Sequence, residues 1–221
     1  MGVLLSVRNL HKVYPTSSGE VPALNGVDYD FEEGKFYAIL GKSGSGKSTL
    51  LHILGGLLRP TAGQVLLNGK DLYAQSDAQM AAFRRRYMGF VFQQFNLLDE
   101  YSVKNNICMP LKLDGKKVDP CFFDEVVDAL GLKSKVNKFP AELSGGEQQR
   151  VAIARSVIAK PQLIIADEPT GNLDKKTGEE TLALLMRCAK KYGQTLIVVT
   201  HDPDIAEKAD SILYIVDGLI V

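Results

Sequence analysis

The sequence predicts an α/β fold whose centre is a buried, mainly parallel β-sheet. Two observations lead to this expectation: short runs that are almost entirely apolar, such as residues 162–167 and 195–200, and helical patterns that alternate with them. Strands that helices cover on both faces have no polar side, and this is typical of parallel sheets. With 221 residues, the chain is long enough to form one domain with a substantial core.

Apolar runs bounded by turn residues give the expected strands, which in chain order are residues 3–14, 27–40, 64–69, 88–92, 162–167, 195–200 and 211–216. A turn-rich segment, 16–26, separates the first two. Helical spacing gives the expected helices, which are residues 47–57, a polar stretch ending near 86, 120–130, a helix that begins at 145, 175–192 and 204–209. Because residues 93–159 contain helical patterns only, we expect them to form an inserted α-helical subdomain.

Composition excludes several classes of protein. Lys plus Arg and Asp plus Glu both total 26, so the formal net charge is zero and gives no electrostatic reason to expect nucleic-acid binding. The three cysteines match no metal-binding spacing, which indicates reduced thiols in an intracellular protein. The longest nearly apolar run, residues 50–58, is much shorter than the ~20 residues that span a bilayer.

The segment GKSGSGKS, residues 41–48, lies between an expected strand and an expected helix. It fits the pattern G-x-x-x-x-G-K-[ST], in which glycines let backbone N–H groups turn inward around a phosphate. The Lys47 ammonium should reach the β- and γ-phosphate oxygens, and the Ser48 hydroxyl should ligate Mg²⁺. The residues expected around the phosphates are Gly41, Ser43, Gly44, Ser45, Gly46, Lys47, Ser48 and Thr49. This segment predicts nucleotide binding.

The apolar strand LIIADE, residues 163–168, ends in two carboxylates. A carboxylate in this position can hold Mg²⁺ beside a phosphate loop, and we assign that role to Asp167. Glu168 is then a second carboxylate near the γ-phosphate, suited to orient or deprotonate the attacking water. Acidic residues are common at strand ends, so the phosphate loop upstream is what favours the catalytic interpretation.

Three further residues have a functional and a plain interpretation. Gln93 follows the strand 88–92, and its amide could contact Mg²⁺ or the attacking water, although a surface glutamine is the simpler interpretation. His201 follows the strand 195–200, at the sheet edge where open α/β sheets bind ligands, but a lone histidine there is more often a surface or capping residue. Tyr14 could stack on a base, although aromatic residues in strands usually pack.

The segment LSGGEQQR, residues 143–150, begins a predicted helix with two glycines. Ser144 and Glu147 have the spacing of a capping box. Gly145 and Gly146 then occupy the first helical positions, where each costs roughly 1 kcal/mol relative to Ala. Bare N–H groups at a helix N-terminus suit an anion, which raises the question of why a chain with one phosphate loop would have a second anion site.

Together these motifs resemble the ATP-binding cassette (ABC) ATPases over essentially the whole chain. The ordered set is GKSGSGKS, Gln93, LSGGE, LIIADE, GNLD at 171–174 and His201. The resemblance implies a single ABC ATPase domain whose P-loop NTPase core comprises residues 1–92 and 160–221. This core would include an N-terminal antiparallel β subdomain, and residues 93–159 would form the α-helical subdomain.

The resemblance also implies roles for individual residues. In this family two cassettes pair head to tail, so Ser144, Gly145 and Gly146 would contact the γ-phosphate held by Lys47 of a second copy. The other implied roles are Glu168 as general base, His201 as brace of the γ-phosphate, Gln93 as its sensor, Asp174 at the dimer interface and Tyr14 as the adenine-stacking residue. ATP and Mg²⁺ are the implied cofactors.

Within the family, GFVFQQFNLLDEYSVKNNI and ADEPTGNLDKKTG are most similar to the macrolide-export, lipoprotein-release and bacitracin-resistance group. This similarity implies a transport-coupled ATPase, an exporter or antimicrobial-peptide resistance system, bound to a permease at the cytoplasmic face of the membrane. We expect the groove around Gln93 and residues 96–101 to contact the permease. The alternative is a regulatory ATPase of cell division, which drives a membrane partner without transport. A third interpretation is a nucleotide-binding module without turnover, in which Glu168 would have no catalytic role.

Overall fold

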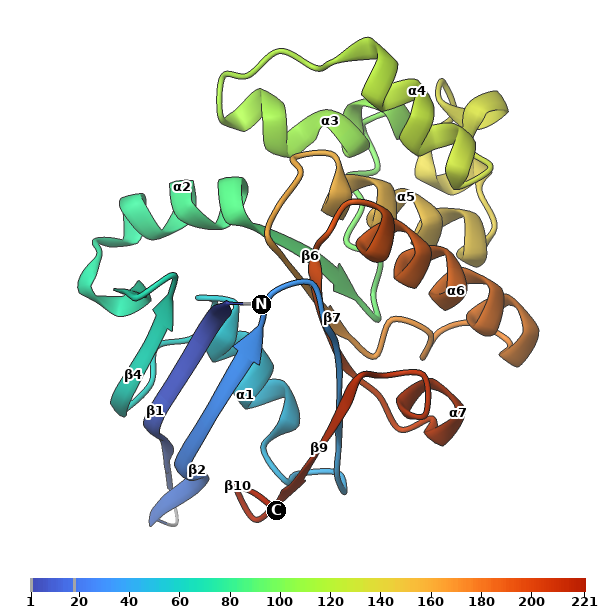
Figure 1. The fold of residues 1–221 in the computed structure, drawn as a ribbon. Coiled ribbons are helices and arrows are strands. Elements are labelled where there is room, and N and C mark those ends of the chain that lie inside the picture. The colour runs from blue at the N-terminus through green and yellow to red at the C-terminus, as the bar shows by residue number, and fades with distance from the viewer. Residues whose placement is uncertain (1, 18) are drawn as a thin grey trace. The chain divides into compact units, whose positions relative to one another are not determined.

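The computed structural model describes residues 2–17 and 19–221 (Figure 1). The chain divides into two compact units, Met1–Ala81 with Ile197–Val221 and Ala82–Leu196, which we call unit 1 and unit 2. The first boundary lies in α2 (Asp77–Tyr87) and the second in β8 (Thr195–Val199). Within the described ranges, no helix is both long and apolar enough to cross a membrane.

The N-terminal part of unit 1 is an antiparallel sheet, which confirms this part of the predicted fold. Its order is β2-β1-β4-β5, and its strands are β1 (Val3–Thr16), β2 (Gly19–Glu32), β4 (Ala62–Leu67) and β5 (Lys70–Asp71). Leu5, Val7 and Leu10 of β1 are fully buried. Apolar side chains on one face therefore give this sheet its core.

Two expectations about this region are wrong. Most of the predicted turn 16–26 is strand, because β2 begins at Gly19 and pairs with β1 along its length. Ser18, which the predicted turn includes, lies outside the described residues. The predicted strand 27–40 is two strands, β2 and β3 (Phe36–Leu40), since the chain turns at Gly34, whose φ is +70°, and passes into a second sheet.

Unit 1 also contains strands of the mainly parallel sheet, in the order β10-β9-β3-β8. β3 pairs in parallel with β9 (Ser211–Val216), and β10 (Leu219–Ile220) pairs with β9 in the antiparallel sense. The helices that follow these strands are α1 (Lys47–Leu54) and α7 (Pro203–Ala206), and a short 3₁₀ helix, Leu72–Ala74, precedes α2. α1 is shorter than predicted because Gly55 and Gly56 follow its last residue.

Unit 2 combines two parallel strands with helices. The strands are β6 (Met88–Phe92) and β7 (Leu163–Asp167), and their bounds agree closely with the prediction. The helices are α3 (Val103–Leu113), α4 (Pro120–Ala129), α5 (Gly145–Val157) and α6 (Lys175–Lys191), with 3₁₀ turns at Lys133–Lys135 and Pro140–Glu142. As predicted, the chain between β6 and β7 forms helices without strands.

α5 is the helix around which unit 2 packs. It contacts β6, α3, α4 and α6, and Figure 1 shows it among these helices. Its Val151, Ile153 and Val157 are fully buried. β6 comes so close at Gly89 that a Cβ there would lie 2.3 Å from the carbonyl oxygen of Ser156. The absence of a side chain at Gly89 is thus a packing requirement.

We expect Gly89→Ala to destabilise the protein by roughly 1–3 kcal/mol, since β6 must move away from a rigid backbone carbonyl of α5. The midpoint of urea-induced unfolding measures this. Gly2→Ala is the control, because a Cβ there would lie 3.8 Å from the Glu33 side chain, an ordinary contact. Equal unfolding midpoints for the two variants would contradict the packing account.

Candidate nucleotide and catalytic site

In unit 1, the predicted phosphate loop connects β3 to α1 and packs tightly against neighbouring backbone. A Cβ at Gly41 would lie 2.3 Å from the carbonyl oxygen of Ile215, and one at Gly46 would lie 2.4 Å from that of Ala23. Gly46 also has a φ of +106°, a backbone conformation that residues with a Cβ atom rarely adopt. The glycines of this loop are therefore required for its path as well as for close approach to a phosphate.

Lys47 lies at the end of this loop and its side chain is almost completely buried, with 6% exposure. Its ammonium donates hydrogen bonds to the carbonyl oxygens of Gly41, at 2.9 Å, and Lys42, at 2.7 Å. Two carbonyls of the loop thus hold the charge over the loop itself. Because these two carbonyls restrict the ammonium, less conformational freedom is lost when a phosphate binds, which lowers the entropic cost of binding.

The first turn of α1 carries the predicted magnesium ligand and lies next to the predicted base-stacking residue. Its N-cap, Gly46, offers no side chain to cap the first N–H groups, which suits an anion. Ser48 is exposed in this turn. The Tyr14 hydroxyl lies 3.4 Å from the Thr49 hydroxyl, and the Tyr14 side chain is 36% exposed. Within unit 1, the structure therefore places Tyr14 beside the loop. His201 is exposed and is the second residue after β8.

In unit 2, the register of β6 and β7 brings two predicted residues together. Phe92 pairs with Asp167, so Gln93 and Glu168 each directly follow one member of this pair. Both are therefore at the carboxyl ends of adjacent parallel strands, the edge at which open α/β sheets bind ligands.

Glu168 has a left-handed backbone, with φ at +45°. A turn supports this conformation, in which the N–H of Gly171 donates to the Glu168 carbonyl oxygen at 3.0 Å. A non-glycine residue in this region costs of order 1–3 kcal/mol and persists only where its surroundings hold it, as at functional sites. The backbone of Glu168 is thus consistent with the catalytic interpretation.

Gln93 is held by the segment that follows Glu168. Its amide nitrogen donates to Oδ1 of Asn172 at 3.2 Å, and the Asn172 amide donates to the Gln93 carbonyl oxygen at 2.9 Å. A Cβ at Gly171 would lie 2.8 Å from the Gln93 amide nitrogen, so a side chain there would displace the Gln93 amide from its present position. Sequence reasoning missed Asn172 as a partner of Gln93, and its membership of the GNLD motif was the available signal.

The N-terminus of α5 has the predicted capping box. Glu147 accepts from the Ser144 N–H at 2.8 Å, and the Glu147 N–H donates to the Ser144 hydroxyl at 3.3 Å. The Ser144 backbone N–H and the Lys135 ammonium lower the pKa of Glu147 below its usual value. Glu147 is therefore charged near neutral pH and adds a favourable charge at the positive end of the helix.

Packing supplies a second reason for the two glycines at this terminus. A Cβ at Gly146 would lie 2.4 Å from Cγ2 of Thr177, and one at Gly145 would meet Leu173 at 3.5 Å. Thr177 belongs to the first turn of α6, whose N-cap is Asp174; the Thr177 N–H donates to the Asp174 carboxylate at 3.1 Å. Unit 2 thus brings the predicted residues Ser144–Gly146 next to the helix turn that begins at Asp174.

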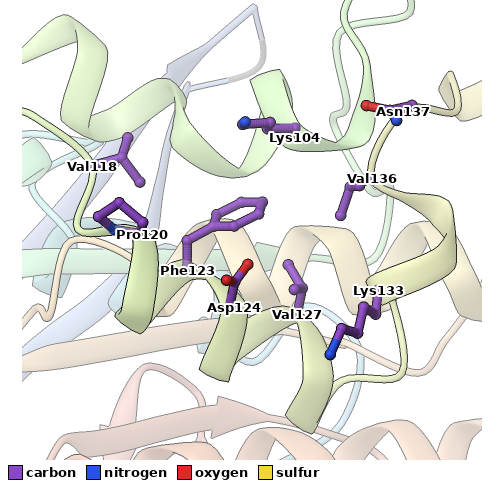
Figure 2. Close-up of a pocket in the computed structure, with 9 residues that line it drawn as sticks. All are labelled: Lys104, Val118, Pro120, Phe123, Asp124, Val127, Lys133, Val136 and Asn137. Atoms are coloured by element: carbon purple, nitrogen blue, oxygen red, sulfur yellow. The ribbon is translucent and has the colours of Figure 1, made fainter.

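A separate hollow of about 580 Å³ lies among α3, α4 and residues 133–137 (Figure 2). Phe123, Val127 and Val136 form apolar walls, and Lys104 and Lys133 also line it. None of the residues predicted to bind nucleotide or magnesium lines this hollow. It is therefore distinct from the predicted site.

The chain is similar to known proteins over its full length. A family model described as ABC transporter matches residues 24–171. The lipoprotein-releasing system ATP-binding protein LolD of Geobacter metallireducens is 44% identical over 223 residues, with 100% of this chain and 99% of that protein covered. The macrolide export ATP-binding/permease protein MacB of Syntrophobacter fumaroxidans is 45% identical, with 98% of this chain but 31% of that protein covered.

Solved structures agree with these matches. The structure described as the dimeric structure of MJ0796, a bacterial ABC transporter cassette, has a TM-score of 0.89 and 38% identity, with 98% of this chain and 96% of that chain covered. The same cassette in a post-hydrolysis state bound to ADP and Pi has a TM-score of 0.88 and 37% identity. The matches agree with the loop that positions Lys47, with Asp167 and Glu168 at the end of β7, and with the capped N-terminus of α5. The chain belongs to the ABC transporter family and is an ATP-binding ATPase of that family.

Proposed function

We propose that this chain is the ATPase subunit that powers a transporter of the lipoprotein-release and macrolide-export group. The observation that carries the proposal is identity of 40–45% along almost the whole chain to proteins named LolD and MacB. Its proposed location is the cytoplasmic face of the membrane, where a permease subunit holds it. The identity of the permease would decide among three roles, which are macrolide export, lipoprotein release and peptide resistance.

We assign ATP binding to the residues that surround the phosphate loop. The loop N–H groups and the Lys47 ammonium bind the β- and γ-phosphates, and Tyr14 stacks on the adenine. The buried, doubly hydrogen-bonded ammonium and the partly exposed Tyr14 beside the loop support these roles.

Mg²⁺ ligation is assigned to the Ser48 hydroxyl, the Asp167 carboxylate and the Gln93 amide oxygen. These are the hard oxygen donors that Mg²⁺ prefers, and Ser48 lies in a helix turn without a side-chain cap. No group of three His, Cys, Asp or Glu in the described ranges could hold a metal by itself. Mg²⁺ that is bound partly through nucleotide phosphates needs no such group, and when bound it neutralises charge on those phosphates.

Hydrolysis is assigned to Glu168 as the base that takes a proton from the attacking water. Gln93 follows the neighbouring strand, and its bonds with Asn172 couple its position to the segment after Glu168. His201 would brace the γ-phosphate. We also propose that residues 1–92 and 160–221 form the P-loop NTPase core with its β subdomain and that residues 93–159 form an inserted α-helical subdomain.

The active form is proposed to be an ATP-driven head-to-tail dimer. Ser144, Gly145 and Gly146 of one copy would bind the γ-phosphate held by Lys47 of the other, and Asp174 would lie at the interface. In support, Ser144 and Asp174 are both exposed, and the two helix N-termini they cap lie next to each other in unit 2. A similar cassette is described as dimeric.

The permease is proposed to bind the loop Asn96–Tyr101, which we call the docking loop. Buried Asn106 fixes this loop, because its side chain accepts from the Leu98 N–H at 2.8 Å and donates to the carbonyls of Leu98 and Tyr101 at 3.0 and 2.9 Å. Leu98 and Tyr101 nevertheless remain exposed, at 42% each. A rigid loop that presents large apolar side chains is suited to bind a partner.

Lys47→Ala should weaken ATP binding by roughly 10- to 100-fold, because a hydrogen bond to a charged group contributes about 1.5–3 kcal/mol. Lys42→Ala is the matched control, since Lys42 is an exposed lysine of the same loop. Isothermal titration of both variants with ATP measures the effect. Unchanged affinity in Lys47→Ala would remove the assignment of the phosphate loop.

The double variant Leu98→Asp/Tyr101→Asp should lose its membrane partner and keep its basal ATPase activity, because it changes exposed side chains only. The measurement is capture of the tagged chain from native membranes in the presence of ATP, followed by identification of the bound proteins. We expect an integral membrane permease with the wild-type chain and none with the variant. Capture of a cell-division membrane protein would instead favour the alternative role, and equal capture by both chains would reject the docking loop.

A further inference from the structure

Gln149 of α5 is a fully buried amide in an apolar surrounding, and it has no role in the assignments above. Its neighbours on the helix, Val151, Ala152 and Ile153, are all fully buried. Its side-chain nitrogen donates to two backbone carbonyls that are far away in the sequence, those of Phe92 and Pro169. Its Oε1 is buried and has no hydrogen-bond partner among the described residues.

The two accepting residues flank the proposed sensor and the proposed base. Phe92 directly precedes Gln93, and Pro169 directly follows Glu168. Since Phe92 and Asp167 are register partners, the Gln149 amide spans the two strand ends just where each strand leaves the sheet. The Gln149 side chain therefore connects the backbone next to Gln93 with the backbone next to Glu168.

Simple core packing does not explain a glutamine here. A buried acceptor without a partner destabilises the folded state, and an apolar side chain of similar volume would avoid that cost. The benefit that remains is in the two donated bonds. They act beside Glu168, whose left-handed backbone needs such external support.

We infer that Gln149 is a positioning residue that fixes the distance between Gln93 and Glu168 and connects both to the N-terminus of α5. This inference rests on the roles proposed above for Gln93 and Glu168. Gln149 lies five residues after Ser144 on the same helix. Movement of the α5 N-terminus, when Ser144–Gly146 engage a phosphate, is therefore passed to the sensor and the base through one amide.

The test compares Gln149→Met with Gln194→Met in the full-length chain. Gln194 is a matched control in the same unit, because it too is a buried amide that donates to a proline carbonyl, that of Pro161, and has an unpartnered Oε1. We expect Gln149→Met to lower kcat for ATP by about 10- to 100-fold, with KM for ATP unchanged, since small displacements of catalytic groups have effects of this size. Gln194→Met should retain the wild-type kcat, although its melting temperature should be similar to that of Gln149→Met.

Hydrogen exchange of backbone amides provides a readout that general destabilisation would not reproduce. In Gln149→Met, the amide of Gly171, which donates to the Glu168 carbonyl, should exchange faster, and Gln194→Met should leave it unchanged. If Gln149→Met does not fold, Gln149→Asn replaces it, because the shorter amide stays polar and cannot reach both carbonyls. A reduced kcat in this variant at unchanged KM would again support the inference.

A wild-type kcat in Gln149→Met or Gln149→Asn, or an equal loss in Gln194→Met, would overturn the inference. Glu168→Gln, measured in parallel, separates this failure from failure of the proposed catalytic roles. If Glu168→Gln abolishes turnover and the Gln149 variants do not reduce it, only the positioning role is rejected. If Glu168→Gln retains turnover, the assignment of the base is rejected and the inference with it.

Discussion

The packing of α5 in the interior of unit 2 is the interaction on which the rest of that unit depends. β6 touches this helix closely enough to require glycine at position 89, and α3, α4 and α6 pack on its other sides. Its half-buried Arg155 donates to the backbone carbonyls of Phe95 and Asn96, and desolvation lowers the pKa of this guanidinium. The segments after β6 and β7 are therefore held by a helix whose own N-terminus is exposed.

The structural requirement in unit 1 is different, because its loop must position a positive charge and a set of backbone N–H groups to bind a phosphate. Close backbone contacts at Gly41 and Gly46 fix the path of the loop, and the loop's own carbonyls orient Lys47. A loop whose path and charge are fixed by its own backbone loses less conformational entropy when a phosphate binds. In unit 2, by contrast, the segments that carry Gln93 and Glu168 are held through side-chain amides, because Gln149 and Asn172 each bond to backbone that is distant in the sequence.

The sequence predicts most strands of the mainly parallel sheet well. Both faces of these strands are buried, as Ile165 and Val198 illustrate, so each strand is a continuous apolar run in the sequence. It does not predict the first part of β2, residues 19–26, because a two-stranded ribbon with exposed residues such as Glu20 and Val21 has the composition of a turn. The chemistry-bearing residues could be chosen from motifs because their spacing along the chain is local. Gln149 and Asn172 could not be paired with their partners, since the bonds of these amides join residues 57 and 79 positions apart.

The central claim is that the exposed N-terminus of α5 completes the ATP site of a second chain, which would explain why one protein has two anion-binding segments. Lys47→Ala and Ser144→Arg should each be inactive alone, the first through its own loop and the second by blocking its partner's site. Mixed in equal amounts with ATP, they should regain ATPase activity, because one site of each mixed dimer combines an intact loop with an intact α5 terminus. ATPase activity of the mixture that does not exceed the sum of the two separate variants would contradict the claim.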